Sequence, residues 1–112
     1  MNNKQIITDE DVEKAVDFLI NTAEKAAKYK AERIYLTEYR KSLKALLMKQ
    51  NLDLPISAQE REAYASPVYI QHLETLKIAI ERDEKQRFLR IAADAKIEAW
   101  RSMSANLRSI KL

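Results

Sequence analysis

The chain has 112 residues, of which 46% are hydrophobic and 33% are charged, and its 20 Lys and Arg against 17 Asp and Glu give a net charge of +3. This length predicts one domain at most. The chain has no Gly and no Cys, which excludes Gly-rich phosphate loops, disulfides and thiolate metal sites. Both prolines fall in one short polar stretch, so long helices joined by a connector are expected.

Residues 8–50 are predicted to form the first long helix, after a flexible lead-in over residues 1–7. Thr8 is the expected N-cap, and the carboxylates that follow it favour the positive end of the helix dipole. Asp11 stands three residues after Thr8, which is a weaker version of the capping box. Apolar side chains then recur at helical spacing as far as Leu47, with no strong breaker, so a continuous helix is expected.

Residues 51–66 are predicted to form the connector. Ser57 and Glu60 have the spacing of a capping box, which predicts a short helix over residues 58–64.

The second long helix is predicted over residues 67–110, because Ser66 suits the N-cap and Pro67 suits the first helical position. Its apolar stripe is interrupted by the polar residues 81–87, for which a solvated waist, a polar layer or a bend are all open interpretations. The stripe is then expected to resume with Phe88, Ile91, Ala92, Ala95, Ala99, Met103, Leu107 and Ile110.

The predicted fold class is all-α, a long antiparallel helical hairpin with a short helical connector that forms a single domain. Two helices alone leave much of their apolar stripes in water. Self-association into a helical bundle or coiled coil is therefore expected, with a dimer favoured. A monomer with a folded-back connector, or a hairpin completed by another protein, are the alternatives.

No catalytic, cofactor or metal site is predicted, and the chain is expected not to be an enzyme. It has one His and no Cys, and the residue three before His72 is Tyr69, so the Glu-x-x-His motif of di-metal bundles is absent. No apolar run reaches the length that spans a membrane, and no signal-peptide pattern is visible. The expected location is the cytoplasm, with no membrane partner.

A row of arginines on the second helix is the strongest candidate for nucleic-acid binding. Each residue turns a helix by about 100°, which places these arginines on one side of it. The four are Arg87, Arg90, Arg101 and Arg108. A guanidinium row can contact successive phosphates of DNA, with Lys41 and Lys44 of the first helix as helpers. The alternative is an ordinary solvated face, paired with nearby carboxylates.

Aromatic and apolar residues supply a second kind of candidate surface. Tyr35 and Tyr39 lie among basic residues and are expected either to stack on unpaired bases or to belong to a bundle interface. Trp100, Met103 and Leu107 are candidate anchors for a protein partner. For Trp100 the alternative is an ordinary bundle residue that caps the end of the core.

Three stretches, YRKSLKALLMKQ (39–50), QEREAYASPVY (59–69) and AKIEAWRSMSANLRS (95–109), resemble short helical uncharacterised proteins of tailed bacteriophages and prophages. The resemblance covers residues 30–110 and carries no catalytic residue. It implies a phage accessory protein, in the host cytoplasm, encoded near recombination or replication genes. The leading hypothesis is a non-enzymatic protein that binds nucleic acid or a nucleoprotein complex through a basic helical flank. The alternative is an inhibitor or adaptor that docks a helical face on a host or phage enzyme.

Overall fold

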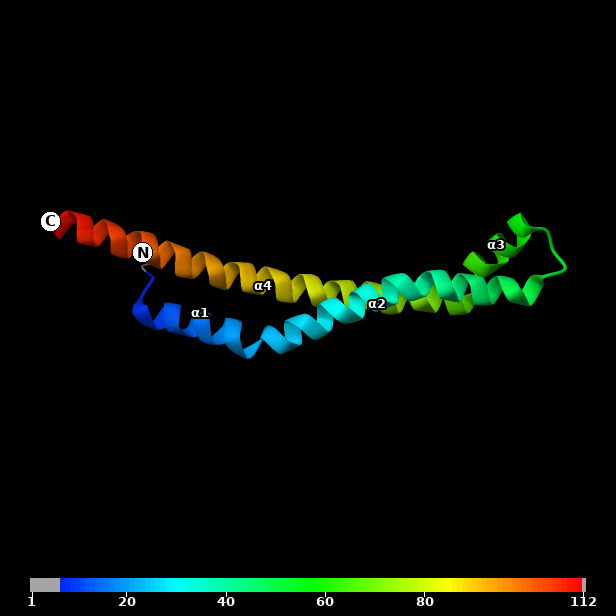
Figure 1. Ribbon diagram of the computed structural model, residues 1–112, viewed down its shortest axis with the longest axis horizontal. Coiled ribbons are helices and arrows are strands. Elements are labelled where there is room, and N and C mark those ends of the chain that lie inside the picture. Colours follow the sequence, from blue (N-terminus) through cyan, green and yellow to red (C-terminus); the bar gives the residue numbers. More distant parts are fainter. Residues whose placement is uncertain (1–6, 112) are drawn as a thin grey trace, which may run out of the picture. The chain divides into compact units, whose positions relative to one another are not determined.

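The structure is a computed structural model that describes residues 7–111 of the chain. All of the regular structure in that range is helical, which confirms the predicted all-α class. The elements, labelled in Figure 1, are α1 (Asp9–Asn21), α2 (Ala23–Met48), the 3-10 helix η1 (Lys49–Asn51), α3 (Ile56–Ala65) and α4 (Pro67–Lys111). The predicted flexible lead-in lies outside the described residues, apart from Ile7.

The helices form two compact units. The terminal unit comprises Met1–Ala26 and Lys85–Leu112, and the central unit comprises Ala27–Glu84. Both units share α4, whose first part belongs to the central unit and whose remainder belongs to the terminal unit. The single domain expected from the sequence therefore stays a prediction.

Each unit pairs an earlier helix with α4 in antiparallel fashion. In the terminal unit, Asp9 contacts Trp100 while Leu19, further along α1, contacts Arg90, which comes earlier in α4. In the central unit, α2 runs beside the first part of α4, and α3 packs near their ends (Figure 1). This arrangement is the helical hairpin that the sequence predicts.

Both predicted caps of the long helices are confirmed. The Thr8 N–H donates to Asp11 Oδ2 at 3.0 Å, and the Asp11 N–H donates to Thr8 Oγ1 at 3.1 Å, which completes a capping box. The backbone hydrogen bond from Thr8 is the main reason why the pKa of Asp11 lies below its usual value. At the start of α4, Ser66 Oγ accepts a hydrogen bond from the Val68 N–H at 3.3 Å.

The prediction of an unbroken first helix is wrong at Thr22, which lies between α1 and α2. Its backbone has φ of −105° and ψ of 2°, outside the usual helical range. The Thr22 hydroxyl donates to the carbonyl oxygen of Phe18 at 2.7 Å, and its N–H donates to the same oxygen at 3.0 Å. Thr side chains that bond a carbonyl one turn earlier compete with the helical pattern and bend helices. Thr37 and Thr75 make the same kind of bond inside unbroken helices, so this bond alone does not explain the break. Thr22 differs because its hydroxyl also accepts a hydrogen bond from Arg90.

The start of the connector helix also differs from the prediction. Helix α3 begins at Ile56, with Pro55 at the N-cap and no capping hydrogen bond from a side chain. The predicted capping box of Ser57 and Glu60 is therefore wrong. The Glu60 carboxylate instead accepts a hydrogen bond from Lys44 Nζ of α2 at 2.7 Å. That contact holds α3 against α2.

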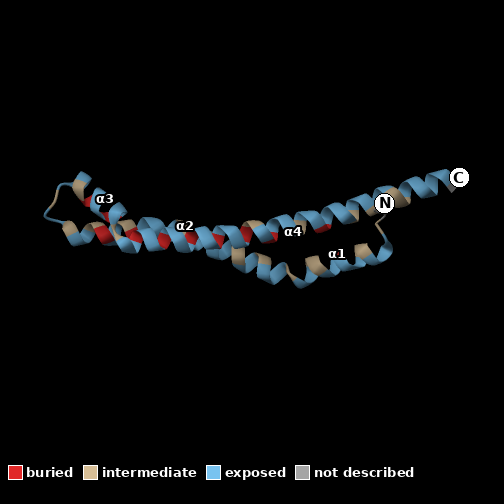
Figure 2. Ribbon diagram, turned by 180° about the vertical axis from the view of Figure 1, so that it is seen from behind, coloured by how far each residue is buried: buried red, intermediate tan, exposed pale blue. Residues whose placement is uncertain are grey.

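The apolar core of the central unit is small. Its buried cluster joins α2, α3 and α4, and consists of Leu43, Leu47, Ala63 and Tyr69, with Met48 packed against it. Figure 2 shows buried residues in red where these helices run side by side. Among the described residues, no large side chain is completely buried. The fold therefore gains less from apolar burial than a core of large side chains would supply.

The inner seam of α4 is partly polar. Its buried residues recur at spacings of three and four as far as Gln86, with one more a heptad later, and are Tyr69, His72, Leu76, Ala79, Asp83, Gln86 and Ala93. The apolar stripe expected from Phe88 onwards does not face inward, because Phe88 and Ile91 are 58% and 50% exposed. The polar stretch at residues 81–87 contributes Asp83 and Gln86 to the inner seam, so it acts as a polar layer. The helix stays continuous through it.

Candidate functional site

The buried polar groups of the central unit are paired within the chain. The Arg33 guanidinium forms an ion pair and hydrogen bond with the Asp83 carboxylate, across α2 and α4. His72 Nε2 lies 2.8 Å from the carbonyl oxygen of Leu36, so the ring nitrogen that carries hydrogen donates there. These contacts satisfy polar groups that would otherwise be costly to bury. Asp83 and His72 therefore have a structural role in the central unit.

Arg90 has a structural role in the terminal unit. Its guanidinium donates to the carbonyl oxygen of Leu19 at 3.0 Å and to Thr22 Oγ1 at 2.8 Å. Both acceptors lie where α1 ends, and a cation there suits the negative end of the helix dipole. The prediction that Arg90 shares an exposed row with the other arginines is therefore wrong. Arg90 instead stabilises the break at Thr22.

The other three predicted arginines are exposed and lie whole heptads apart along α4, which keeps them on one flank. Arg87 packs on the Phe88 ring, with its guanidinium carbon 4.7 Å from the ring centroid. Arg101 forms an ion pair with Glu98 at 2.6 Å. Arg101 and Arg108 also line a shallow hollow of about 530 Å³. Their nucleic-acid role stays a prediction.

The three predicted anchors of a protein partner differ in their surroundings. Trp100 Nε1 donates to Asp9 Oδ1 at 2.8 Å, so the Trp100 ring of α4 contacts the first turn of α1 within the terminal unit. Met103 is half-buried and Leu107 is exposed. Trp100 therefore has an intramolecular role, and the partner role of all three residues stays a prediction.

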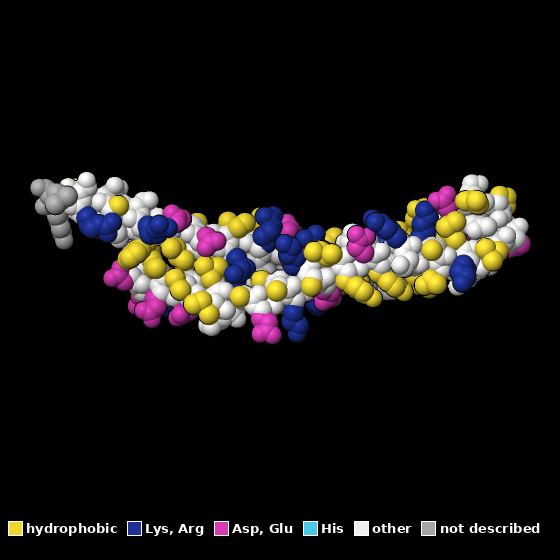
Figure 3. Space-filling view, in the orientation of Figure 1, with side chains coloured by type: hydrophobic (Ala, Val, Ile, Leu, Met, Phe, Trp, Pro, Cys, Tyr) yellow, Lys and Arg dark blue, Asp and Glu magenta, His cyan; other side chains and the backbone are white. Residues whose placement is uncertain are grey.

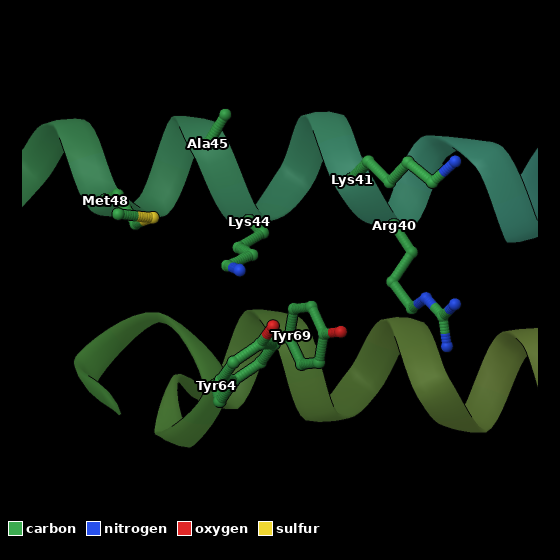
Figure 4. Close-up of a pocket in the computed structure, with 7 residues that line it drawn as sticks. All are labelled: Arg40, Lys41, Lys44, Ala45, Met48, Tyr64 and Tyr69. Atoms are coloured by element: carbon green, nitrogen blue, oxygen red, sulfur yellow. The ribbon is translucent and has the colours of Figure 1, made fainter. Parts of the chain in front are cut away.

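A basic pocket lies in the central unit, where α2 faces α3 and α4. Its volume is about 660 Å³, and its lining residues are Arg40, Lys41, Lys44, Ala45, Met48, Tyr64 and Tyr69. Figure 4 shows Arg40 and Lys44 extending from α2 towards the other helices, with Tyr64 and Tyr69 opposite Lys44, whereas Lys41 extends along α2. Lys41 and Lys44 are the predicted helpers. Arg40 and the two tyrosines were not among the predicted binding residues.

Electrostatics distinguish the three cations of this pocket. The hydrogen bond to Glu60, and then the interaction with Tyr64, raise the pKa of Lys44 above its usual value, so Lys44 stays charged. Lys41 Nζ pairs with Glu38 at 3.1 Å, on an exposed part of α2. Arg40 forms no hydrogen bond or ion pair with any residue in the described part of the chain.

Tyr35 and Tyr39 are brought together but do not line the basic pocket. Their rings stack with centroids 6.0 Å apart and an interplanar angle of 16°. Tyr39 also lies 5.6 Å from the His72 ring, which holds it beside the inner seam. Tyr35 is largely exposed. Tyr39 therefore contacts the seam while Tyr35 faces solvent, and the roles in base stacking and in an interface stay predictions.

Between residues 7 and 111, no group of three or more His, Asp and Glu side chains is placed to hold a metal ion. None of the helices described is long and apolar enough to cross a membrane.

Comparison with protein-family models, with curated proteins and with solved structures found no match for the chain. The resemblance to short phage proteins therefore stays a prediction, and the function is inferred from the geometry.

Proposed function

We propose that the chain is a non-enzymatic helical module whose function depends on association, with a second copy of the chain as its first partner. The supporting observation is the distribution of side chains between the inner seam and the outer surface. Polar residues occupy part of the inner seam, while large apolar side chains point outwards. Figure 3 shows such side chains in yellow on the visible face.

The exposed apolar residues occur in both units, each at least 40% exposed. In the central unit they include Ile34, Tyr35, Leu46, Ile70, Leu73, Ile78 and Ile80. In the terminal unit they include Ile20, Phe88, Leu89 and Ile91. Scattered exposed apolar residues are normal on soluble proteins. The unusual feature is that these side chains remain outside while Asp83 and Gln86 are buried. Covering one half-exposed Ile or Leu stabilises an assembly by about 1 kcal/mol.

The experiment compares two double variants of α2 by light scattering. Ile34→Glu with Leu46→Glu places charges on the outer apolar surface, and we expect it to shift the assembly to monomers. Ala31→Glu with Ser42→Glu is the matched control, because it adds the same charge at exposed small residues. We expect the control to keep the assembly, and both variants to keep the helicity of the parent by circular dichroism. Equal dissociation by both variants counts against the proposal.

A second candidate function is nucleic-acid binding through the flank of α4 that carries Arg87, Arg101 and Arg108. The observation that favours it is the exposure of this row beside the hollow that Arg101 and Arg108 line. Phosphate contacts by three cations predict a steep loss of affinity between low and physiological salt. Such binding fits the recombination or replication setting implied by the resemblance to phage proteins.

A mobility-shift titration with single- and double-stranded DNA at two salt levels tests this candidate. Arg101→Glu with Arg108→Glu should abolish binding, whereas Lys14→Glu with Lys85→Glu, which changes two other exposed cations of the terminal unit, should weaken it far less. The absence of a shift at micromolar protein in low salt refutes nucleic-acid binding. A monomeric protein without DNA binding would favour an adaptor for a host or phage enzyme.

A further inference from the structure

We propose that the basic pocket of the central unit binds a phosphorylated ligand of nucleotide size. The phosphate contacts Arg40 and Lys41, and the planar ring of the ligand packs against Tyr64 and Met48. This binding activity goes beyond association and uses different residues.

The lining of the pocket favours an anion. Three of its side chains are cations, and none of the lining residues is a carboxylate. Arg40 has no partner among the residues that the structure describes, so its guanidinium is available for the two parallel hydrogen bonds that phosphate oxygens accept. The stretch from residue 40 to residue 49 contains four Lys or Arg and no Asp or Glu, which makes this end of α2 locally positive.

The two neighbouring carboxylates leave the anion site open. Glu60 is bound to Lys44, and the Lys44 ammonium lies over one face of the Tyr64 ring, 4.9 Å from its centroid, which leaves the other face of the ring for the ligand. Glu38 pairs with Lys41 where both side chains are well exposed. Exposed ion pairs contribute little to stability, so Lys41 can exchange Glu38 for a phosphate at small cost.

The aromatic wall supplies the surface for the ring of the ligand. Tyr64 is 48% exposed, and its ring meets Tyr69 edge-to-face at 5.2 Å and 76°. Tyr69 is buried in the core, so it holds Tyr64 in one orientation. Aromatic faces stack on nucleobases of any sequence, and Met48 adds an adaptable apolar contact. The volume of about 660 Å³ lies within the usual range for small-molecule pockets.

Isothermal titration calorimetry of the full chain tests the proposal with AMP, adenosine and inorganic phosphate as probes. AMP should bind more tightly than either fragment, because only AMP makes both kinds of contact. A 5′-phosphorylated oligothymidylate and its unphosphorylated form distinguish the sources of the ligand. Preference for the phosphorylated strand over AMP indicates a nucleic-acid end, and the reverse preference indicates a free nucleotide. Equal weak heats from AMP, adenosine and phosphate overturn the proposal.

Variants locate the site. Arg40→Gln with Lys41→Gln should weaken AMP binding by about tenfold or more, since hydrogen bonds to a charged group are lost. Arg61→Gln with Lys77→Gln removes the same charge from exposed positions outside the pocket, and should leave the affinity within about twofold. A similar loss in both double variants overturns the proposal, because it indicates only a general charge effect.

Tyr64→Leu separates the ring contact from the phosphate contact. This variant keeps an apolar side chain at a half-exposed position, and should weaken AMP by about tenfold while leaving inorganic phosphate unchanged. Unchanged AMP affinity overturns the assigned ring contact. Light scattering of the same samples reports association separately, so failure of the pocket and failure of association are distinguishable.

Discussion

Removing either partner of the Arg33–Asp83 pair should destabilise the central unit, and the two single variants should differ. The Asp83 side chain is 10% exposed and the Arg33 side chain is 35% exposed. Arg33→Leu therefore leaves an unpaired carboxylate in a nearly dry position, which we expect to cost about 3 kcal/mol. Asp83→Leu leaves a guanidinium that reaches water, so the expected cost is lower, about 1 to 2 kcal/mol.

The double variant Arg33→Leu with Asp83→Leu completes the cycle. Replacing a buried pair by apolar residues is often neutral or stabilising, so its stability should lie within about 1 kcal/mol of the parent or above it. Urea unfolding, followed by circular dichroism at one fixed protein concentration, measures all four proteins. Two equal single effects that simply add in the double variant would refute the assignment of this pair to the inner seam.

Three further changes test the helix ends. Arg90→Met removes two hydrogen bonds at the end of α1 and should destabilise the terminal unit by about 1 to 3 kcal/mol, with faster hydrogen exchange confined to α1. The lowered pKa of Asp11 means that its stabilising effect is present above the ordinary value of 3.8 and is lost as the pH falls below it. In Asp11→Asn, the helicity of α1 should therefore depend less on pH in the acid range than it does in the parent. An unchanged pH dependence would argue against the capping box. Ser66→Ala should cost about 1 kcal/mol in urea unfolding, and no loss would show that Ser66 does not cap α4.

Local features of the fold could be predicted from the sequence. The starts at Thr8 and Ser66 depend on side chains within three residues, so their spacing alone identifies them. The break at Thr22 could not be predicted in the same way. Its hydroxyl accepts a hydrogen bond from Arg90, which lies 68 residues away in the chain.

The inward face of α4 is the main feature that periodicity misplaces. Apolar spacing identifies Phe88 and Ile91 as a stripe, but it does not say which row of the helix meets its neighbour. The structure buries Asp83 and Gln86 on the inner seam, and Asp83 is tolerated there because Arg33 comes from another helix to pair with it. A tertiary contact therefore decides against the local pattern.

The basic pocket was only half predictable. Lys41 and Lys44 are visible as part of a basic run on α2. The opposite wall depends on the connector folding back, which the Lys44–Glu60 contact and the burial of Ala63 in the core cluster bring about. Neither contact has a signal in the sequence.

The central claim is that the large apolar side chains on the outside of the fold are covered by a second copy of the chain. Light scattering after size-exclusion chromatography, over a wide range of protein concentrations, tests this claim most directly. We predict a mass of at least twice the 13.0 kDa of one chain at micromolar concentration. A mass of 13.0 kDa at every concentration would contradict the account.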